Sequence, residues 1–197
     1  MRKIVQKLAI TSLLVSSLSL SGCGYNTLQV KDEAVTAAWS EVENQYQRRA
    51  DLVPNLVNVV KGYAKHEEKV LTEVTQARAN VAGLKVDKAV LDDPAAFQRY
   101  QEAQGQLDGA LSRLIAISEN YPDLKANEQF RDLQVQLEGT ENRIAVARNR
   151  YIASVQDFNS YSRQFPQVMT AKVIGMQPKP NFKAEAGAQQ APKVTFE

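Results

Sequence analysis

Residues 130–165, FRDLQVQLEGTENRIAVARNRYIASVQDFNSYSRQF, carry the pattern that decides the fold. Mainly apolar side chains recur there in unbroken alternating steps of three and four residues. That period places them on one face of a helix. The stretch therefore predicts one long helix, packed along its full length and ended by Pro166. The stripe consists of Phe130, Leu133, Leu137, Thr140, Ile144, Ala147, Tyr151, Ser154, Phe158, Tyr161 and Phe165.

An earlier segment has the same period. It predicts a helix of roughly 70 Å that starts at Asp32 as N-cap and continues past Glu67 to Val81. Pro54 interrupts this helix and should kink it near residues 50–53, where Asp51 could cap the freed amides. The stripe is Val35, Trp39, Val42, Tyr46, Arg49, Val53, Leu56, Val60, Tyr63, Val70, Val74, Ala77 and Val81.

A third segment, from Pro94 to about Asn120, predicts another helix, with Asp92 and Asp93 before Pro94 as its cap and first turn. Its stripe is Tyr100, Gln104, Leu107, Leu111 and Leu114. No strand-like alternation competes with these patterns. The sequence predicts an all-α fold, an elongated antiparallel up-and-down bundle of three to four long helices that is coiled-coil-like. The kink at Pro54 decides between three and four.

The N-terminus has the layout of a secretory signal, with basic residues before an apolar stretch from Leu8 to Leu20. The apolar stretch is too short to span a membrane. Leu20-Ser21-Gly22-Cys23 resembles the lipobox of bacterial lipoproteins, in which the cysteine is acylated. We predict a lipoprotein signal peptide over residues 1–22 and a lipidated tether over residues 23–31. The alternative is an ordinary cleaved signal with a chance cysteine.

Composition excludes several classes of protein. Removal of residues 1–22 leaves 21 basic and 22 acidic residues, so no nucleic-acid footprint is expected. Cys23 is the only cysteine, so no disulfide can form within the chain.

One bundle domain is predicted over residues 32–175, followed by a disordered tail over residues 176–197. The apolar stretch at residues 168–176 either folds back on the bundle or pairs with a partner.

The chain lacks the residues that common catalytic sites need. A di-metal bundle site requires two Glu-x-x-His motifs, whereas His66 is the only histidine. No nucleophile with a matching base, and no glycine-rich phosphate loop, is present. We expect no enzyme, no metal and no cofactor, and a surface or capping position for His66. The aromatic residues Tyr63, Tyr100, Tyr151, Tyr161, Phe158 and Phe165 are expected in the core.

Arg49 is the one charged residue on the apolar stripe of the first helix, and charges rarely enter a core unpaired. Three interpretations are open: its head reaches water while its stem packs, it pairs with a carboxylate such as Glu141 and fixes helix register, or it belongs to a polar cluster that binds a partner. The candidate interaction and register cluster comprises Arg48, Arg49, Asp51, Pro54, Asn55, Glu141 and Arg148.

Over residues 25–175 the sequence resembles the LemA family, because it contains several motifs of that family in the same order. The signature block is RRADLVPNLV at residues 48–57, followed by Lys61-Gly62-Tyr63-Ala64 and His66-Glu67. Further matches are Tyr25-Asn26, Ala38-Trp39, Ala77-Arg78, Tyr121-Pro122-Asp123-Leu124, Phe130, Glu141-Asn142-Arg143-Ile144, Ala147-Arg148, Arg150-Tyr151, Phe158-Asn159 and Phe165-Pro166. Ile152 and Phe158 depart from the Asn and Tyr that are common at these positions. The resemblance implies a helical bundle on the outer side of a membrane and no agreed reaction.

These observations predict a non-enzymatic envelope lipoprotein, held in the membrane by acylated Cys23, that acts as an interaction or scaffold module for an unidentified envelope protein. Gly24 after the cysteine favours the outer membrane, facing the periplasm, over the inner membrane. The alternatives are a self-associating structural spacer for envelope integrity and an activator of an envelope enzyme.

Overall fold

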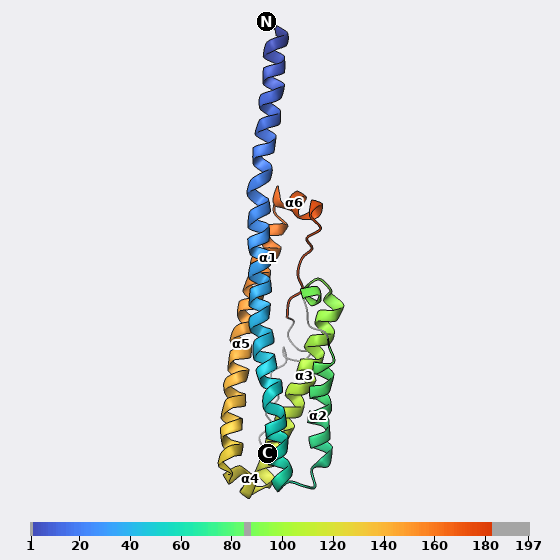
Figure 1. The fold of residues 1–197 in the computed structure, drawn as a ribbon, viewed down its shortest axis with the longest axis vertical. Helices are drawn as coiled ribbons and strands as arrows, with labels where there is room; N and C mark the ends of the chain where they lie inside the picture. The colour runs from blue at the N-terminus through green and yellow to red at the C-terminus, as the bar shows by residue number, and fades with distance from the viewer. Residues whose placement is uncertain (1, 85–87, 183–197) are drawn as a thin grey trace, which may run out of the picture.

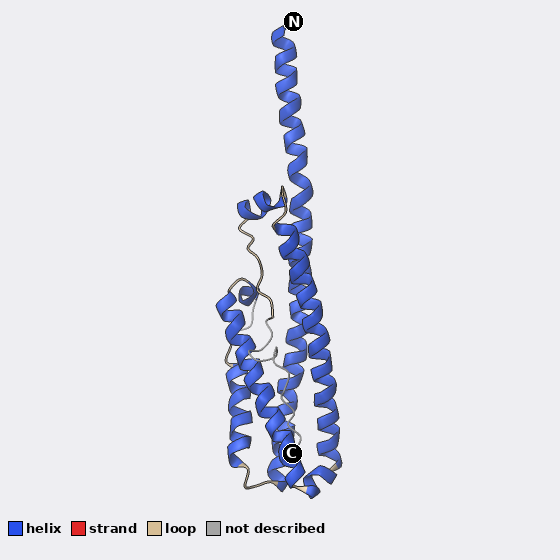
Figure 2. Cartoon of the chain, turned by 180° about the vertical axis from the view of Figure 1, so that it is seen from behind, coloured by secondary structure: helices blue, strands red, loops and turns tan. Residues whose placement is uncertain are grey.

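The computed structural model describes residues 2–84 and 88–182, with side chains over residues 24–84 and 90–182. Within these residues the chain is helical and contains no strand (Figures 1 and 2). The helices are α1 (Arg2–Tyr63), α2 (Glu68–Ala82), α3 (Pro94–Ile117), α4 (Pro122–Ala126), α5 (Glu128–Ser162) and α6 (Gln167–Val173), with 3-10 turns at Lys88–Leu91 and Ser118–Asn120.

Four long helices run up and down in sequence order, which confirms the predicted antiparallel bundle. α1 packs most extensively against α5, and α2 packs against α3. α4 closes the end where α1 turns into α2, and α6 lies across the opposite end beside α1 (Figure 1). Among the described residues the bundle has four long helices and not three, because the chain reverses after Tyr63.

That reversal corrects the prediction of one helix running to Val81. α1 continues through Pro54 and ends at Tyr63, before a turn in which the Glu67 amide donates to the Ala64 carbonyl at 3.1 Å. α2 then buries Leu71, Val74, Ala77 and Val81. Both helices point their stripes into one core, so the period alone does not reveal the turn between them.

The start of the bundle is also earlier than predicted. Residues 24–31 belong to α1, and Leu28 is fully buried, so Asp32 is not an N-cap and this segment does not hang free of the fold. Asp32 instead lies on the buried face, where Lys179 pairs with it. The predicted signal peptide and the Cys23 side chain lie outside the residues whose side chains are described. Within the described part of the chain, no helix combines the length and apolar content needed to cross a bilayer.

The stripe of α5 is confirmed over most of its length, but it shifts by one residue near its end. Val155 and Ser162 are buried there in place of Ser154 and Tyr161. Steps of three and four average 3.5 residues per turn, whereas a straight helix has 3.6, so the buried face drifts along a long helix. α5 ends at Ser162, and Phe165 is 84% exposed, so its predicted core position is wrong.

The core positions predicted for Tyr100, Tyr151 and Phe158 are confirmed, whereas Tyr63 is 44% exposed. Tyr63 is the last residue of α1, and its hydroxyl accepts a hydrogen bond from Asn127. The α3 stripe is buried as predicted, and Asp93 caps this helix by accepting from the Ala95 amide at 2.8 Å.

The segment 174–182 returns along the bundle from α6, so residues 176–182 are packed and not a disordered tail. The Tyr151 hydroxyl donates to the Pro180 carbonyl at 2.9 Å, and Asn159 makes two hydrogen bonds to the Lys179 backbone. Phe182 packs among Trp39, Phe97 and Tyr151, with ring centroids 5.1–6.2 Å away. The remainder of the predicted tail, residues 183–197, lies outside the described residues.

Candidate functional site

Arg49 forms the centre of a buried polar layer that joins α1, α3 and α5. Its side chain is 3% exposed. One guanidinium nitrogen donates to both carboxylate oxygens of Glu141 at 3.0 and 3.2 Å, and the other donates to the side chain and backbone oxygens of Gln104 at 2.7 and 3.3 Å. Of the three interpretations of Arg49, the pair with Glu141 is the one present, and the guanidinium does not extend to bulk solvent.

The layer retains unused hydrogen-bonding capacity. Arg49 Nε and Gln104 Nε2 are buried without a protein partner. Both residues line a cavity of about 50 Å³, together with Asp108 and Glu141. Buried donors next to a polar cavity of this size are typical of a bound water site.

Two buried tyrosines flank the layer. The Arg49 guanidinium lies 5.2 Å from the ring centre of Tyr46, whose own ring is 5.8 Å from that of Tyr100. Burial raises the pKa of both phenols above the ordinary value of 10. Both therefore remain protonated at neutral pH, where they can donate hydrogen bonds but cannot act as general bases.

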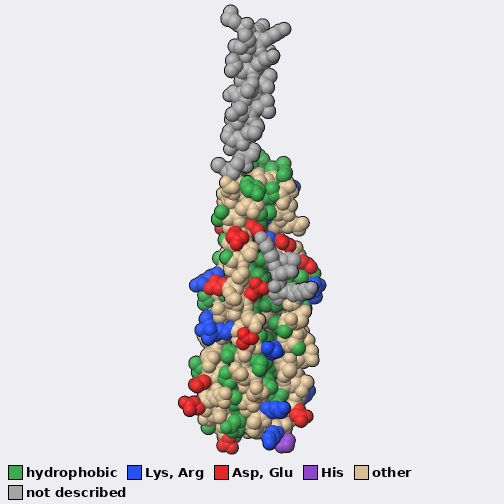
Figure 3. Space-filling view, in the orientation of Figure 1, with side chains coloured by type: hydrophobic (Ala, Val, Ile, Leu, Met, Phe, Trp, Pro, Cys, Tyr) green, Lys and Arg blue, Asp and Glu red, His purple; other side chains and the backbone are tan. Residues whose placement is uncertain are grey.

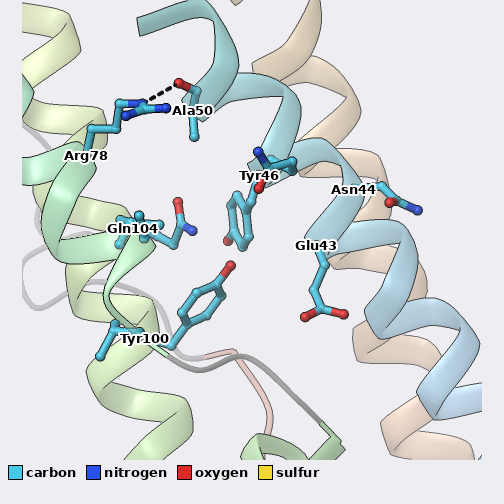
Figure 4. Close-up of a pocket in the computed structure, with 11 residues that line it drawn as sticks. Glu43, Asn44, Tyr46, Ala50, Arg78, Tyr100 and Gln104 are labelled. Carbon is cyan, nitrogen blue, oxygen red and sulfur yellow. Dashed lines mark hydrogen bonds between the residues drawn. The ribbon is translucent and has the colours of Figure 1, made fainter. Parts of the chain in front are cut away.

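A pocket of about 420 Å³ opens beside these tyrosines between α1, α2 and α3 (Figure 4). The hydroxyl groups of Tyr46 and Tyr100 turn toward one another there, and the Gln104 side chain reaches the same space. Glu43 and Arg78 supply opposite charges at its walls. The lining is suited to hydrogen bonding, and its two phenols provide no base at neutral pH.

Arg78, at the edge of this pocket, compensates for a hydrogen bond that α1 loses at Pro54. Pro54 has no amide hydrogen, so the carbonyl four residues earlier, that of Ala50, loses its partner within α1. The Arg78 Nε of α2 donates to that carbonyl at 3.0 Å (Figure 4). The proline is thus accommodated within an uninterrupted helix by a hydrogen bond from the neighbouring helix.

The structure brings together only part of the predicted cluster. Arg49, Glu141 and Arg148 meet at the small cavity. Arg48, Asp51, Pro54 and Asn55 are exposed on α1. Asp51 accepts from Gln47 of the same helix at 2.8 Å and caps no freed amide. His66 is exposed in the turn between α1 and α2, as predicted.

A second buried charge cluster was not predicted from sequence. Lys179, 8% exposed, lies 2.9 Å from an Asp32 oxygen and 2.6 Å from an Asp92 oxygen. Burial lowers the pKa of Lys179, but hydrogen bonds to Asp92 and Asp32 outweigh it, so the pKa is raised overall. Gln104 was also missing from the predicted cluster, although its position as a polar residue on an apolar stripe could have revealed it. No such signal marks Lys179, because it lies in a segment without helical periodicity.

Among the described residues, no group of three or more His, Cys, Asp or Glu side chains could hold a metal ion. The geometry defines a class of protein. It is an elongated helical bundle whose helices are joined by buried ion pairs and whose long sides offer surface for contacts. A family model described as the LemA family matches residues 38–196, and the chain belongs to the LemA family.

The chain is similar to magnetosome protein MamQ of Magnetospirillum gryphiswaldense, at 27% identity over 95% of this chain and 75% of the relative. It is similar to magnetosome protein MamQ 2 of Paramagnetospirillum magneticum at 25% identity, over 87% of this chain and 68% of the relative. It also resembles protein LemA of Metamycoplasma hominis, at 25% identity over 68% and 58% of the two chains.

Proposed function

We propose that this LemA family member is a non-enzymatic envelope lipoprotein, anchored by acylated Cys23, that presents its helical bundle to a partner protein on the periplasmic side of the outer membrane. The observation that carries the proposal is the position of the lipobox-like motif at one end of a rod. Residues 23–63 of α1 extend about 60 Å. A lipid at residue 23 would hold the rod by its end and leave its sides free.

The surface is better suited to contact than to chemistry. In the buried layer Arg49 is paired with Glu141 and Gln104, and the phenols beside it stay protonated. The relatives named as magnetosome proteins support a membrane-associated role. Gly24 after Cys23 favours the outer membrane.

The first test is metabolic labelling with an alkyne fatty acid, followed by membrane fractionation. We expect the native chain to be labelled and to sediment with membranes, and Cys23→Ser to lose both properties. The double variant Cys23→Ser/Asn26→Cys is the matched control, because it moves the single cysteine to an exposed position three residues away. Labelling of that control would show that the motif does not direct acylation, and a membrane-bound Cys23→Ser chain would contradict the anchor.

A self-associating spacer is the second candidate, favoured by two exposed apolar residues on α5. Val135 and Val146 are 67% and 50% exposed. Their spacing of eleven residues is three helical turns, so they share one face. A stable oligomer of the unlipidated chain that dissociates on Val135→Lys/Val146→Lys substitution would favour the spacer over the interaction module.

A further inference from the structure

We propose that the α6 face, defined as Phe165, Met169 and Val173, inserts into the lipid surface beside the anchor at Cys23. The inference rests on the proposed lipid anchor and adds a second membrane contact. Apolar protein surface that inserts into a bilayer adds to the attachment given by acyl chains. The α6 face supplies such a surface.

The first observation is exposure in a regular pattern. Met169 and Val173, 58% and 85% exposed, lie one helical turn apart on α6, and Phe165, 84% exposed, lies in the turn just before the helix. Ala171, on the other side of α6, is 4% exposed and packs against the bundle. The short helix is therefore amphipathic with its apolar side turned outward, the reverse of a core helix.

The second observation is position. A Cβ on Gly24, the residue after Cys23, would lie 3.4 Å from Gln167 of α6. α6 thus packs directly on the backbone next to the proposed acylation site. Both ribbon views draw α6 across the long axis of the bundle, at the end from which the N-terminal segment leaves (Figures 1 and 2). A rod standing on its anchor would hold α6 along the membrane plane.

The surface around α6 has the composition of a membrane contact. Exposed Tyr25 and Val30 of α1 lie at the same end of the rod. The space-filling view shows hydrophobic side chains gathered where the described body meets the N-terminal segment (Figure 3). Residues 160–176 contain Arg163 and Lys172 and no acidic residue, which favours contact with anionic headgroups.

A lipid surface fits this patch better than a second copy of the chain. Three side chains of this size bury on the order of 400 Å² together, about half of what each partner contributes to a stable protein interface. Lipid insertion has no such requirement, because the anchor already holds the patch at the membrane.

The test uses the full lipidated chain with a fluorescent label on a new cysteine. Acylation of Cys23 leaves an introduced cysteine as the only reactive thiol. Met169→Cys and Val173→Cys place an NBD label on the α6 face, and Val135→Cys is the matched control, exposed on α5 toward the other end of the rod. Each protein is reconstituted in vesicles of phosphatidylethanolamine and phosphatidylglycerol with or without spin-labelled lipid.

We expect spin-labelled lipid to quench the labels at residues 169 and 173 at least about threefold more than the label at residue 135. Flotation with the vesicles but no excess quenching would overturn the membrane contact and leave the anchor standing. Two reactive thiols per chain and no flotation would overturn the anchor, and the membrane contact with it. If the unlabelled Met169→Cys chain crosslinks to itself in detergent, the membrane contact is overturned and the face belongs to a contact between two copies.

Discussion

At the scale of single residues, Arg49 shows how a charge is accommodated in the core of this bundle. Leaving a guanidinium buried without a partner would cost several kcal/mol. Here Glu141 neutralises it and Gln104 accepts two of its hydrogen bonds. One side chain thereby fixes the register of three helices, because each partner comes from a different helix.

Substitution of Glu141 by Gln should lower the free energy of unfolding by about 1–3 kcal/mol. The buried Arg49 guanidinium would then have no carboxylate within hydrogen-bonding distance. Asp108→Asn is the matched control, because Asp108 lies farther from Arg49, at 3.7 Å, and is 54% exposed. The control should change stability by less than about 0.5 kcal/mol. Urea denaturation at neutral pH measures both, and equal losses would contradict a special role for the buried pair.

Pro54 and Arg78 are coupled through the Ala50 carbonyl. Arg78→Ala should cost about 1–2 kcal/mol in the native chain, because it leaves that carbonyl without a partner. In a Pro54→Ala background the backbone amide at residue 54 can satisfy the carbonyl, so the same substitution should cost less.

A double-mutant cycle from urea denaturation tests this coupling, with an expected interaction energy of about 1 kcal/mol. Arg78→Lys is a useful comparison, since it retains the charge without the Nε donor. Additive effects of Arg78→Ala and Pro54→Ala would show that Arg78 does not compensate for the proline.

At the scale of elements, the C-terminal segment completes the core. α2 and α3 cover only part of the length of the α1–α5 pair, and the segment 174–182 lies beside that pair beyond them (Figure 1). Phe182 closes the aromatic cluster around Trp39, and Arg148 lies 4.4 Å from the centre of the Phe182 ring. Lys179 ties the segment to α1 and to the residues before α3.

Lys179→Met should destabilise the protein by about 2 kcal/mol at pH 8, since it leaves two carboxylates without their cation. The pKa of folded Lys179 is raised above the unfolded value of about 10.4. Its stabilising contribution is therefore full below that pH and is lost as pH rises through the folded pKa.

The stability difference between the native chain and Lys179→Met should consequently shrink as the pH rises above about 10.4 and through the raised pKa of folded Lys179. Lys125→Met is the control, because Lys125 and its partner Glu119 are both exposed. Its substitution should change the free energy of unfolding by less than about 0.5 kcal/mol in denaturant unfolding. If the stability difference for Lys179→Met does not change with pH, then packing, and not the ion pairs, keeps residues 174–182 on the bundle.

At the scale of the whole molecule, length is the defining property. A compact globule of about 175 residues has a radius of gyration of about 16 Å. A rod about 60 Å long and 20 Å wide has a value of about 19 Å. Small-angle scattering of residues 24–197 should give the larger value at monomer mass, and a compact value would contradict the bundle geometry.

The sequence by itself determined the all-α class, the long helices and most of their buried faces, because the spacing of apolar residues is a local property of each helix. It also singled out Arg49 and offered Glu141 as its partner in one of three open interpretations, among which the tertiary structure decided. Only the tertiary structure decided where the chain reverses, since α1 and α2 bury the same stripe on both sides of the turn at residues 64–67. The same holds for Lys179, Phe182 and Arg78, whose roles depend on partners 28 to 147 residues away in the chain. No period encodes contacts between segments that meet only after the helices have packed.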